Sequence, residues 1–194
     1  MIDKVDGKRI ANDIDFYLIA LFRALQNGWI PPGNVSEEEY IAIKNNIDNF
    51  PPELVGFVGY PCSYAGKWFG GYARGKKNNG IPRNYADEGK RHLLKQAKKL
   101  NGVKILNKNY LDLKLKLKCI IYCDPPYENT TKYKNGFNHK EFWNWVRKMK
   151  EFGHSVFISE YSAPEDFECI WEKDVCSSLT KETGSKRATE KLFV

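Results

Sequence analysis

The sequence lacks any apolar stretch long enough to cross a membrane, because charged residues interrupt each run well before the ~20 residues that a span needs. We therefore expect neither a transmembrane segment nor a signal peptide, and no membrane among the partners. Internal repeats and low-complexity segments are also absent from the sequence. The chain has 194 residues, of which 42% are hydrophobic and 14% aromatic, a composition typical of a folded protein rather than a disordered one. We expect one domain over residues 1–194.

Paired or clustered metal-binding residues are missing as well. The cysteines form an odd number without a short repeated spacing, and the three histidines are scattered along the chain. A zinc site needs more ligands at regular spacing, so we predict no metal. Buried free thiols in a reducing cytoplasm are the better interpretation. The cysteines are Cys62, Cys119, Cys123, Cys169 and Cys176.

Positive charge is present in excess and is concentrated in one window. The chain has 31 basic and 24 acidic residues, for a net charge of +7. Residues 64–100 contain ten basic residues against two acidic ones, so this window alone carries +8 and the rest of the chain is close to neutral. A local excess of this size favours a polyanionic partner such as nucleic acid.

Hydrophobic periodicity predicts alternating strands and helices, which indicates an α/β fold with parallel connections. Predicted strands cover residues 8–12, 103–106, 119–123, 155–159 and 191–194, and the run 119–123 is apolar throughout, as in a buried parallel strand. We predict one helix after each of three cap residues, Asp15, Ser36 and Asn138. A further helix is predicted over residues 85–100. Phe142, Trp145 and Met149 are expected in the core.

The middle of the chain is less regular. Pro51 and Pro52 break the second predicted helix. Residues 54–71 are apolar, aromatic and rich in glycine, which fits a packed turn region or a loop that lets a ligand approach the main chain. Residues 75–84 are predicted to form an exposed basic loop.

The residues best suited to chemistry are Asp124, Pro125, Pro126 and Tyr127, directly after the apolar run 119–123. Ligands of open α/β sheets bind beyond the carboxyl ends of strands, so this turn has the position of a reaction site. The amino group of a nucleobase is a poor nucleophile because its lone pair is delocalised into the ring. The Asp124 carboxylate and the Pro125 carbonyl can accept hydrogen bonds from its N–H groups, which localises that lone pair. Tyr127 can stack on a base that has left its helix.

A simpler interpretation is that these four residues form only a tight turn, in which the aspartate caps and the prolines stiffen the main chain. Two features favour the chemical interpretation over this one. The turn follows a predicted buried strand, and the same chain carries the basic window.

The run 121–127, Ile-Tyr-Cys-Asp-Pro-Pro-Tyr, resembles the catalytic motif of the Dam-like DNA adenine methyltransferases, above all their phage and prophage members. The similarity extends over nearly the whole chain. It implies a Rossmann-like α/β methyltransferase fold with S-adenosylmethionine as cofactor and double-stranded DNA as partner. The implied reaction is methyl transfer to the exocyclic amino group of adenine, in a protective role such as restriction-modification or in a regulatory one.

The resemblance also implies roles for single residues. Asp13, in the acidic turn 12–15, matches the carboxylate that holds the ribose hydroxyls of the cofactor, while Asp15 is expected to cap the following helix. Asn109 and Tyr110 match the segment that cradles the cofactor's adenine. Asp124 is expected to serve both the reaction and the cofactor, and residues 157–161 resemble the strand that lines the target-base pocket.

The segment 66–74 and the basic stretch after it resemble the region that grips and reads DNA. We expect residues 54–100 to form a DNA-recognition segment inserted within the methyltransferase domain. For Trp68, packing is as good an interpretation as DNA contact, and the basic residues of 90–99 could equally form a solvated helix face. The expected DNA contacts are Lys67, Trp68, Arg74, Lys76, Lys77 and Arg83, the last three on phosphates.

One feature departs from the family pattern. The family's basic motif and glycine-rich Phe-x-Gly-x-Gly loop normally precede the acidic turn by some twenty residues, and neither is found before Asp13. We therefore expect a fold that is incomplete at its N-terminus, with weakened cofactor binding and a compensating partner chain or oligomer. Two alternatives to an active DNA methyltransferase stay open: a catalytically impaired DNA-binding remnant, and an RNA adenine methyltransferase.

Overall fold

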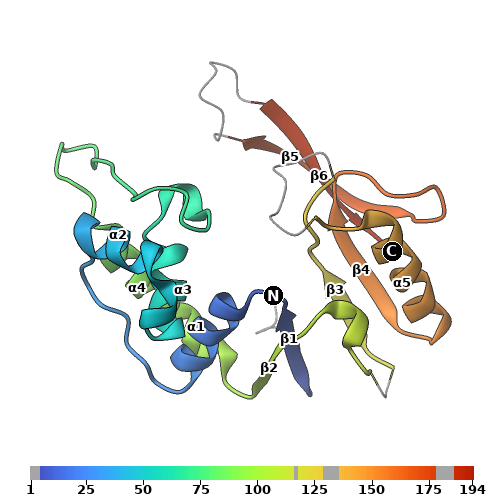
Figure 1. The fold of residues 1–194 in the computed structure, drawn as a ribbon. Coiled ribbons are helices and arrows are strands. Elements are labelled where there is room, and N and C mark those ends of the chain that lie inside the picture. The colour runs from blue at the N-terminus through green and yellow to red at the C-terminus, as the bar shows by residue number, and fades with distance from the viewer. Residues whose placement is uncertain (1–4, 116–117, 129–135, 178–185) are drawn as a thin grey trace. The chain divides into compact units, whose positions relative to one another are not determined.

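The computed structural model describes residues 5–115, 118–128, 136–177 and 186–194 (Figure 1). These residues form a mixed α/β structure that divides into two compact units, residues 1–113 and residues 114–194. The segment 54–100 lies in the first unit, and the single domain expected over the chain stays a prediction. In the described part of the chain, no helix combines the length and the apolar character needed to cross a membrane.

The first unit contains a two-stranded parallel sheet. β1 (Arg9–Asp13) pairs with β2 (Val103–Asn107), which confirms both predicted strands and their parallel direction. Asp13 is paired with Asn107, so the two strands end at the same edge. Ile19, from the helix between them, packs on buried side chains of β2 and closes a small core.

The first helices of this unit begin at the caps that the sequence predicts. α1 (Phe16–Gln26) begins after Asp15, whose carboxylate accepts a main-chain hydrogen bond of 2.7 Å from the first turn. α2 (Glu37–Asn45) begins with a reciprocal capping box. Glu39 N donates to Ser36 Oγ at 3.1 Å, and Ser36 N donates to Glu39 Oε2 at 2.7 Å. Such caps depend on residues three positions apart, which is why the sequence alone identifies them.

The prediction of a turn region or loop over residues 54–71 is wrong in its first part, because Pro52–Gly59 forms α3. Pro52 lies in the first helical turn, where a missing N–H group costs nothing. The proline pair therefore follows the 3₁₀ turn Ile47–Asn49 and at the same time begins a new helix. The remaining residues do form tight turns, including the 3₁₀ turn Tyr64–Gly66.

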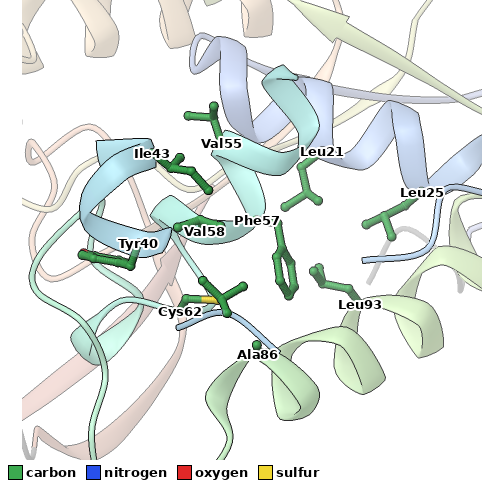
Figure 2. Packing of buried hydrophobic residues seen from close by; sticks show 11 residues of the cluster. Leu21, Leu25, Tyr40, Ile43, Val55, Phe57, Val58, Cys62, Ala86 and Leu93 are labelled. Atoms are coloured by element: carbon green, nitrogen blue, oxygen red, sulfur yellow. The ribbon is translucent and has the colours of Figure 1, made fainter. Parts of the chain in front are cut away.

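The main core of the first unit lies between its helices. α4 (Tyr85–Ala97) begins after Asn84 and continues into the 3₁₀ turn Lys98–Leu100, which confirms the helix predicted over 85–100. Figure 2 shows Phe57 pointing from α3 toward Leu93 of α4. The buried members of this core are Leu21, Leu25, Val35, Tyr40, Ile43, Val55, Phe57, Val58, Cys62, Ala86 and Leu93.

The second unit contains a four-stranded sheet in the order β3-β4-β6-β5. β3 (Ile120–Cys123) and β4 (Ser155–Glu160) are parallel and are connected through α5 (His139–Glu151). β6 (Lys186–Phe193) pairs antiparallel with β4 and with β5 (Cys169–Ser177). The predicted strands and helix of this part of the chain are confirmed, and β5 is an addition that the sequence pattern did not predict.

The interior of the second unit lies between α5 and the sheet. Phe142, Trp145 and Met149 are buried, as expected from their helical spacing. The prediction that the strand at 119–123 is buried is wrong, since Ile120 is 69% and Tyr122 is 44% exposed. β3 is the edge strand of its sheet, so among the described residues of this unit one of its sides has no neighbouring strand.

Candidate functional site

The turn at residues 124–127 lies at the carboxyl end of β3, beside the end of β4. The parallel register pairs Cys123 with Ile158, so the turn leaves β3 beside the last residues of β4. Tyr127 Oη shares a hydrogen bond of 2.5 Å with Ser159 Oγ. The Tyr127 ring also packs edge-on against Tyr161, with ring centroids 4.6 Å apart and planes at 82°. Residues of the neighbouring strand end thus fix the tyrosine of the turn.

The surroundings of the turn shift the pKa values of the Asp124 carboxyl and the Tyr127 hydroxyl. Asp124 is exposed as a residue, yet protein atoms around its carboxylate desolvate it and raise its pKa above the ordinary 3.8. A hydrogen bond from Tyr127 lowers that pKa, and the charge of Glu190 raises it. Burial also raises the pKa of Tyr127 to about 12, against the opposing effect of its hydrogen bond with Ser159. At neutral pH Tyr127 therefore keeps its proton.

Glu160, the last residue of β4, is a buried carboxylate that contacts the main chain of the turn. The residue is 1% exposed. Glu128 N donates to Glu160 Oε1 and Tyr161 N donates to Glu160 Oε2, both at 2.7 Å. His139 Nδ1 lies 3.8 Å from the same Oε1. Burial raises the pKa of Glu160, while the two N–H groups and His139 lower it and the Glu128 carboxylate raises it further.

Three of the four residues predicted to hold a cofactor, Asp13, Asn109 and Tyr110, lie at the carboxyl edge of the β1–β2 sheet in the first unit, while Asp124 belongs to the second unit. Asp13 ends β1, and its Oδ1 accepts a hydrogen bond of 2.7 Å from Asp15 N. Asn107 Nδ2 donates to the Asp13 carbonyl at 3.0 Å, which ties the two strand ends together. Asn109 begins the 3₁₀ turn Tyr110–Asp112 two residues later. Burial raises the pKa of the Asp13 carboxyl, and the hydrogen bond from Asp15 N lowers it.

The same edge offers an unused hydrogen-bond acceptor. Asn12 Nδ2 donates to the carbonyl of Lys108 at 3.0 Å, while its buried Oδ1 has no hydrogen-bond partner within the described ranges. A buried acceptor without a partner is costly unless something else satisfies it. Together with the carboxylate of Asp13, this edge therefore fits a ligand that presents hydroxyl or amino groups, such as an adenosine.

The residues predicted to contact DNA lie on the first unit, in and before a short antiparallel loop. Lys76 pairs with Pro82 through a β-bridge. Main-chain hydrogen bonds of 2.9 Å from Lys77 and Arg83 close the loop. The prediction of an exposed basic loop is confirmed, since residues 76–83 are all exposed. Lys67 is exposed as well.

The two arginines of this group are already paired with carboxylates. Arg74 forms an ion pair with Glu37, and its guanidinium lies 5.8 Å from the ring centroid of Tyr72. Arg83 forms two hydrogen bonds with Glu88, and this partner raises its pKa. The exposed lysines of the loop therefore present the charge that is readiest to meet a phosphate.

Trp68 makes extensive packing contacts. Its ring stacks on Tyr17 with centroids 5.3 Å apart and lies 4.9 Å from Tyr60 and 4.7 Å from Phe69. The position of Gly59 explains how the ring fits, because a Cβ there would lie 2.4 Å from Trp68 Cζ3. Packing thus accounts for this residue, while its DNA contact stays a prediction.

The sequence interpretation did not identify several residues that hold the candidate sites. Ser159, Glu160 and His139 support the turn, and Tyr60 Oη donates to the cap residue Asp15 at 2.6 Å. The resemblance pointed only to the segment 157–161 as a pocket lining. A usable signal was present, because an apolar strand that ends in Ser-Glu is the next predicted strand after the motif, and parallel strands bring their carboxyl ends to one edge.

A family model matches a range of the chain that contains several of these residues. The model of the D12 class N6 adenine-specific DNA methyltransferases matches residues 64–184, which is more than half of the chain. The matched range includes the turn 124–127, the end of β4 and the basic loop, whereas Asp13 precedes it. No protein with a curated description matches the chain.

Proposed function

The chain belongs to the D12 class N6 adenine-specific DNA methyltransferase family, and we propose that it transfers a methyl group from S-adenosylmethionine to adenine in double-stranded DNA. The observation that carries this proposal is the turn 124–127, an Asp-Pro-Pro-Tyr sequence at the carboxyl end of a parallel strand. Its tyrosine is fixed by Ser159 and Tyr161. A fixed turn is what a reaction that depends on placed acceptors requires.

In the proposed reaction the chain activates the amino nitrogen of the base. The Asp124 carboxylate and the Pro125 carbonyl accept hydrogen bonds from its two N–H groups and localise the lone pair. The nitrogen would then attack the methyl carbon: an N–C bond would form as the S–C bond breaks, S-adenosylhomocysteine would leave, and the nitrogen would release a proton to solvent. S-adenosylmethionine supplies the electrophilic methyl group. Tyr127 remains a neutral phenol at working pH, and in this proposal its ring would stack on the displaced base.

The cofactor part of the proposal rests on the edge of the β1–β2 sheet. Asp13 would accept hydrogen bonds from the ribose hydroxyls, while Asn109 and Tyr110 would hold the adenine. The unused acceptor of Asn12 at the same edge supports a bound molecule there. The parallel strand pairs with helices between them support a Rossmann-like methyltransferase domain over 1–194, to which both units belong.

The DNA part of the proposal rests on the basic loop. The loop is closed by a single antiparallel β-bridge between Lys76 and Pro82 and is exposed along its length. Lys67, Lys76 and Lys77 would contact phosphates, which position a protein without reading sequence. Arg74 and Arg83 would also contact DNA in this proposal, once each exchanges its carboxylate partner, Glu37 or Glu88, for the DNA.

Product analysis tests the proposal. The protein is incubated with S-adenosylmethionine and either unmethylated duplex DNA or RNA, and the nucleosides are identified by mass spectrometry. We expect N6-methyladenine from the DNA. Methyladenine from RNA alone would make the chain an RNA methyltransferase, and DNA binding without any product would leave a DNA-binding remnant.

A cofactor-site variant tests the role of Asp13 separately. Asp13→Asn removes a charge-assisted acceptor, so the KM for S-adenosylmethionine should rise about tenfold to a hundredfold. The matched control is Asp48→Asn, an exposed aspartate in the 3₁₀ turn Ile47–Asn49. Equal KM values for the two variants would reject the cofactor role of Asp13.

A further inference from the structure

Glu160 is the most completely buried carboxylate among the described residues, and it lies next to the reaction turn. Each of its oxygens accepts one main-chain N–H group at 2.7 Å, from Glu128 and from Tyr161. Distances of this length are typical of hydrogen bonds to an ionised acceptor. Since Glu128 directly follows Tyr127, the carboxylate holds the main chain at the point where the turn ends.

The preceding residue of β4 holds the side chain of the same turn. Ser159 bonds to the Tyr127 hydroxyl, while Glu160 bonds to the next main-chain N–H group. Ser159 and Glu160, the last two residues of β4, therefore hold Tyr127 and Glu128, which follow β3. The contacts span 32 positions in sequence, so they are long-range supports and not the local hydrogen bonds of an ordinary turn.

The surroundings of Glu160 include a second polar group. His139 Nδ1 lies 3.8 Å from Oε1, is buried, and has no hydrogen-bond partner within the described residues. His139 and Glu128 also line an open pocket beside the turn. Burying a carboxylate in such a place costs free energy unless hydrogen bonds and a neighbouring charge offset it. A simple surface turn needs no such arrangement.

We propose that Glu160 is a positioning residue for the methyl transfer: its carboxylate holds the main chain after Tyr127 and so keeps the turn in its reacting conformation. This inference rests on the proposed function. The Asp124 carboxylate and the Pro125 carbonyl act on the base only when they are correctly placed. A displacement of about 1 Å can cost a factor of about 100 in rate.

Glu160→Gln tests this inference with two independent measurements. Glutamine keeps the shape but replaces one acceptor oxygen by an NH₂ group, so one of the two main-chain N–H groups loses its partner. Hydrogen–deuterium exchange, read on a peptide that contains residues 124–128, should become faster. The kcat for methyl transfer should fall about tenfold to a hundredfold, while KM for DNA stays within about twofold. The matched control is Glu165→Gln at an exposed glutamate of the same unit, which should change neither.

A shorter carboxylate provides the second variant. Glu160→Asp keeps the charge and both acceptors but withdraws them by one methylene, so it should restore part of the lost kcat. If circular dichroism shows that Glu160→Gln does not fold, the inference is tested on Glu160→Asp by the same hydrogen–deuterium exchange of residues 124–128. Unchanged exchange in residues 124–128 would overturn the inference, and so would faster exchange with normal kcat.

Failure of the proposed methyl transfer can be distinguished from failure of the inference about Glu160. If the unmodified chain produces no methyladenine, the proposed function fails and the claim of a positioning role in methyl transfer fails with it. Exchange in Glu160→Gln would still show whether the carboxylate holds the turn. With an active parent chain, a loss of kcat together with faster exchange of residues 124–128 in Glu160→Gln supports the inference.

Discussion

Replacing Gly56 by alanine tests how closely α1 and α3 pack. A Cβ at this position would lie 2.3 Å from the main-chain oxygen of Tyr17 and 3.1 Å from the Cβ of Leu21. Real Cβ atoms essentially never come closer than 3.0 Å to another heavy atom, and the obstacle here is main chain, so α1 as a whole would have to move. Overpacking costs about 1–3 kcal/mol, and a rigid obstacle places this case near the upper end. Alanine gains about 1 kcal/mol of helix propensity over glycine, which leaves a net loss of about 2 kcal/mol.

Urea unfolding followed by circular dichroism measures this loss. With a slope of about 1–3 kcal/mol per molar urea, a loss of about 2 kcal/mol lowers the midpoint by about 1 M. Gly33→Ala is the matched control, because its Cβ would meet only Lys90 Nζ at 3.8 Å and its φ is not positive. We expect this control to be unchanged or more stable by up to about 1 kcal/mol.

Two results would contradict close packing of α1 on α3. Stability of Gly56→Ala at or above that of the parent chain would mean that α1 and α3 are not in this contact. An equal loss in Gly33→Ala would mean that the effect does not come from packing. Tyr17 also stacks on Trp68, so a confirmed loss would further indicate that the helix pair supports the segment leading to the basic loop.

Three further predictions concern reactivity, DNA binding and pH. Iodoacetamide should alkylate the exposed Cys169 well before Cys123, because burial raises the pKa of the Cys123 thiol to about 12; equal rates by peptide mass spectrometry would contradict that burial. Lys77→Ala should reduce the salt slope of DNA binding by about 0.9, and Arg83→Ala should reduce it less because a carboxylate already neutralises that guanidinium. Fluorescence anisotropy in a salt series measures both slopes, and equal reductions would count against the ion pair. Desolvation raises the pKa of Asp124 above the ordinary aspartate value of 3.8, and protonation of this carboxylate on lowering the pH removes an acceptor. In a pH profile, kcat/KM should therefore fall with an apparent pKa above 3.8 on the acid side. A fall at or below 3.8 would contradict this.

Local patterns in the sequence predicted much of the fold. The capping box at Ser36 and the cap at Asp15 depend on neighbours within one helical turn, and both are confirmed. The strands before Asp13 and before Asp124 are confirmed for the same reason, since strand runs are local patterns. The helix that begins at Pro52 was missed because a proline pair signals both the end of one helix and the beginning of another.

The supports of the reaction turn could not be predicted from local patterns. The bonds from Ser159 and Glu160 reach across 32 positions, and only the pairing of β3 with β4 brings them to the turn. Exposure of Ile120 is a similar case, because an apolar run does not reveal whether its strand lies at the centre or the edge of a sheet. The pairing of Arg83 with Glu88 is set by loop geometry, which residue types alone do not fix.

The proposed methyl transfer is tested by comparing the parent chain with Asp124→Ala and measuring the DNA affinity of both. Unmethylated duplex DNA is incubated with S-adenosylmethionine that carries an isotopic label in its methyl group, under single-turnover conditions. We expect labelled N6-methyladenine from the parent chain, none from Asp124→Ala, and equal DNA affinity of the two proteins. No labelled product from a parent chain that binds DNA, or equal product from Asp124→Ala, would contradict it.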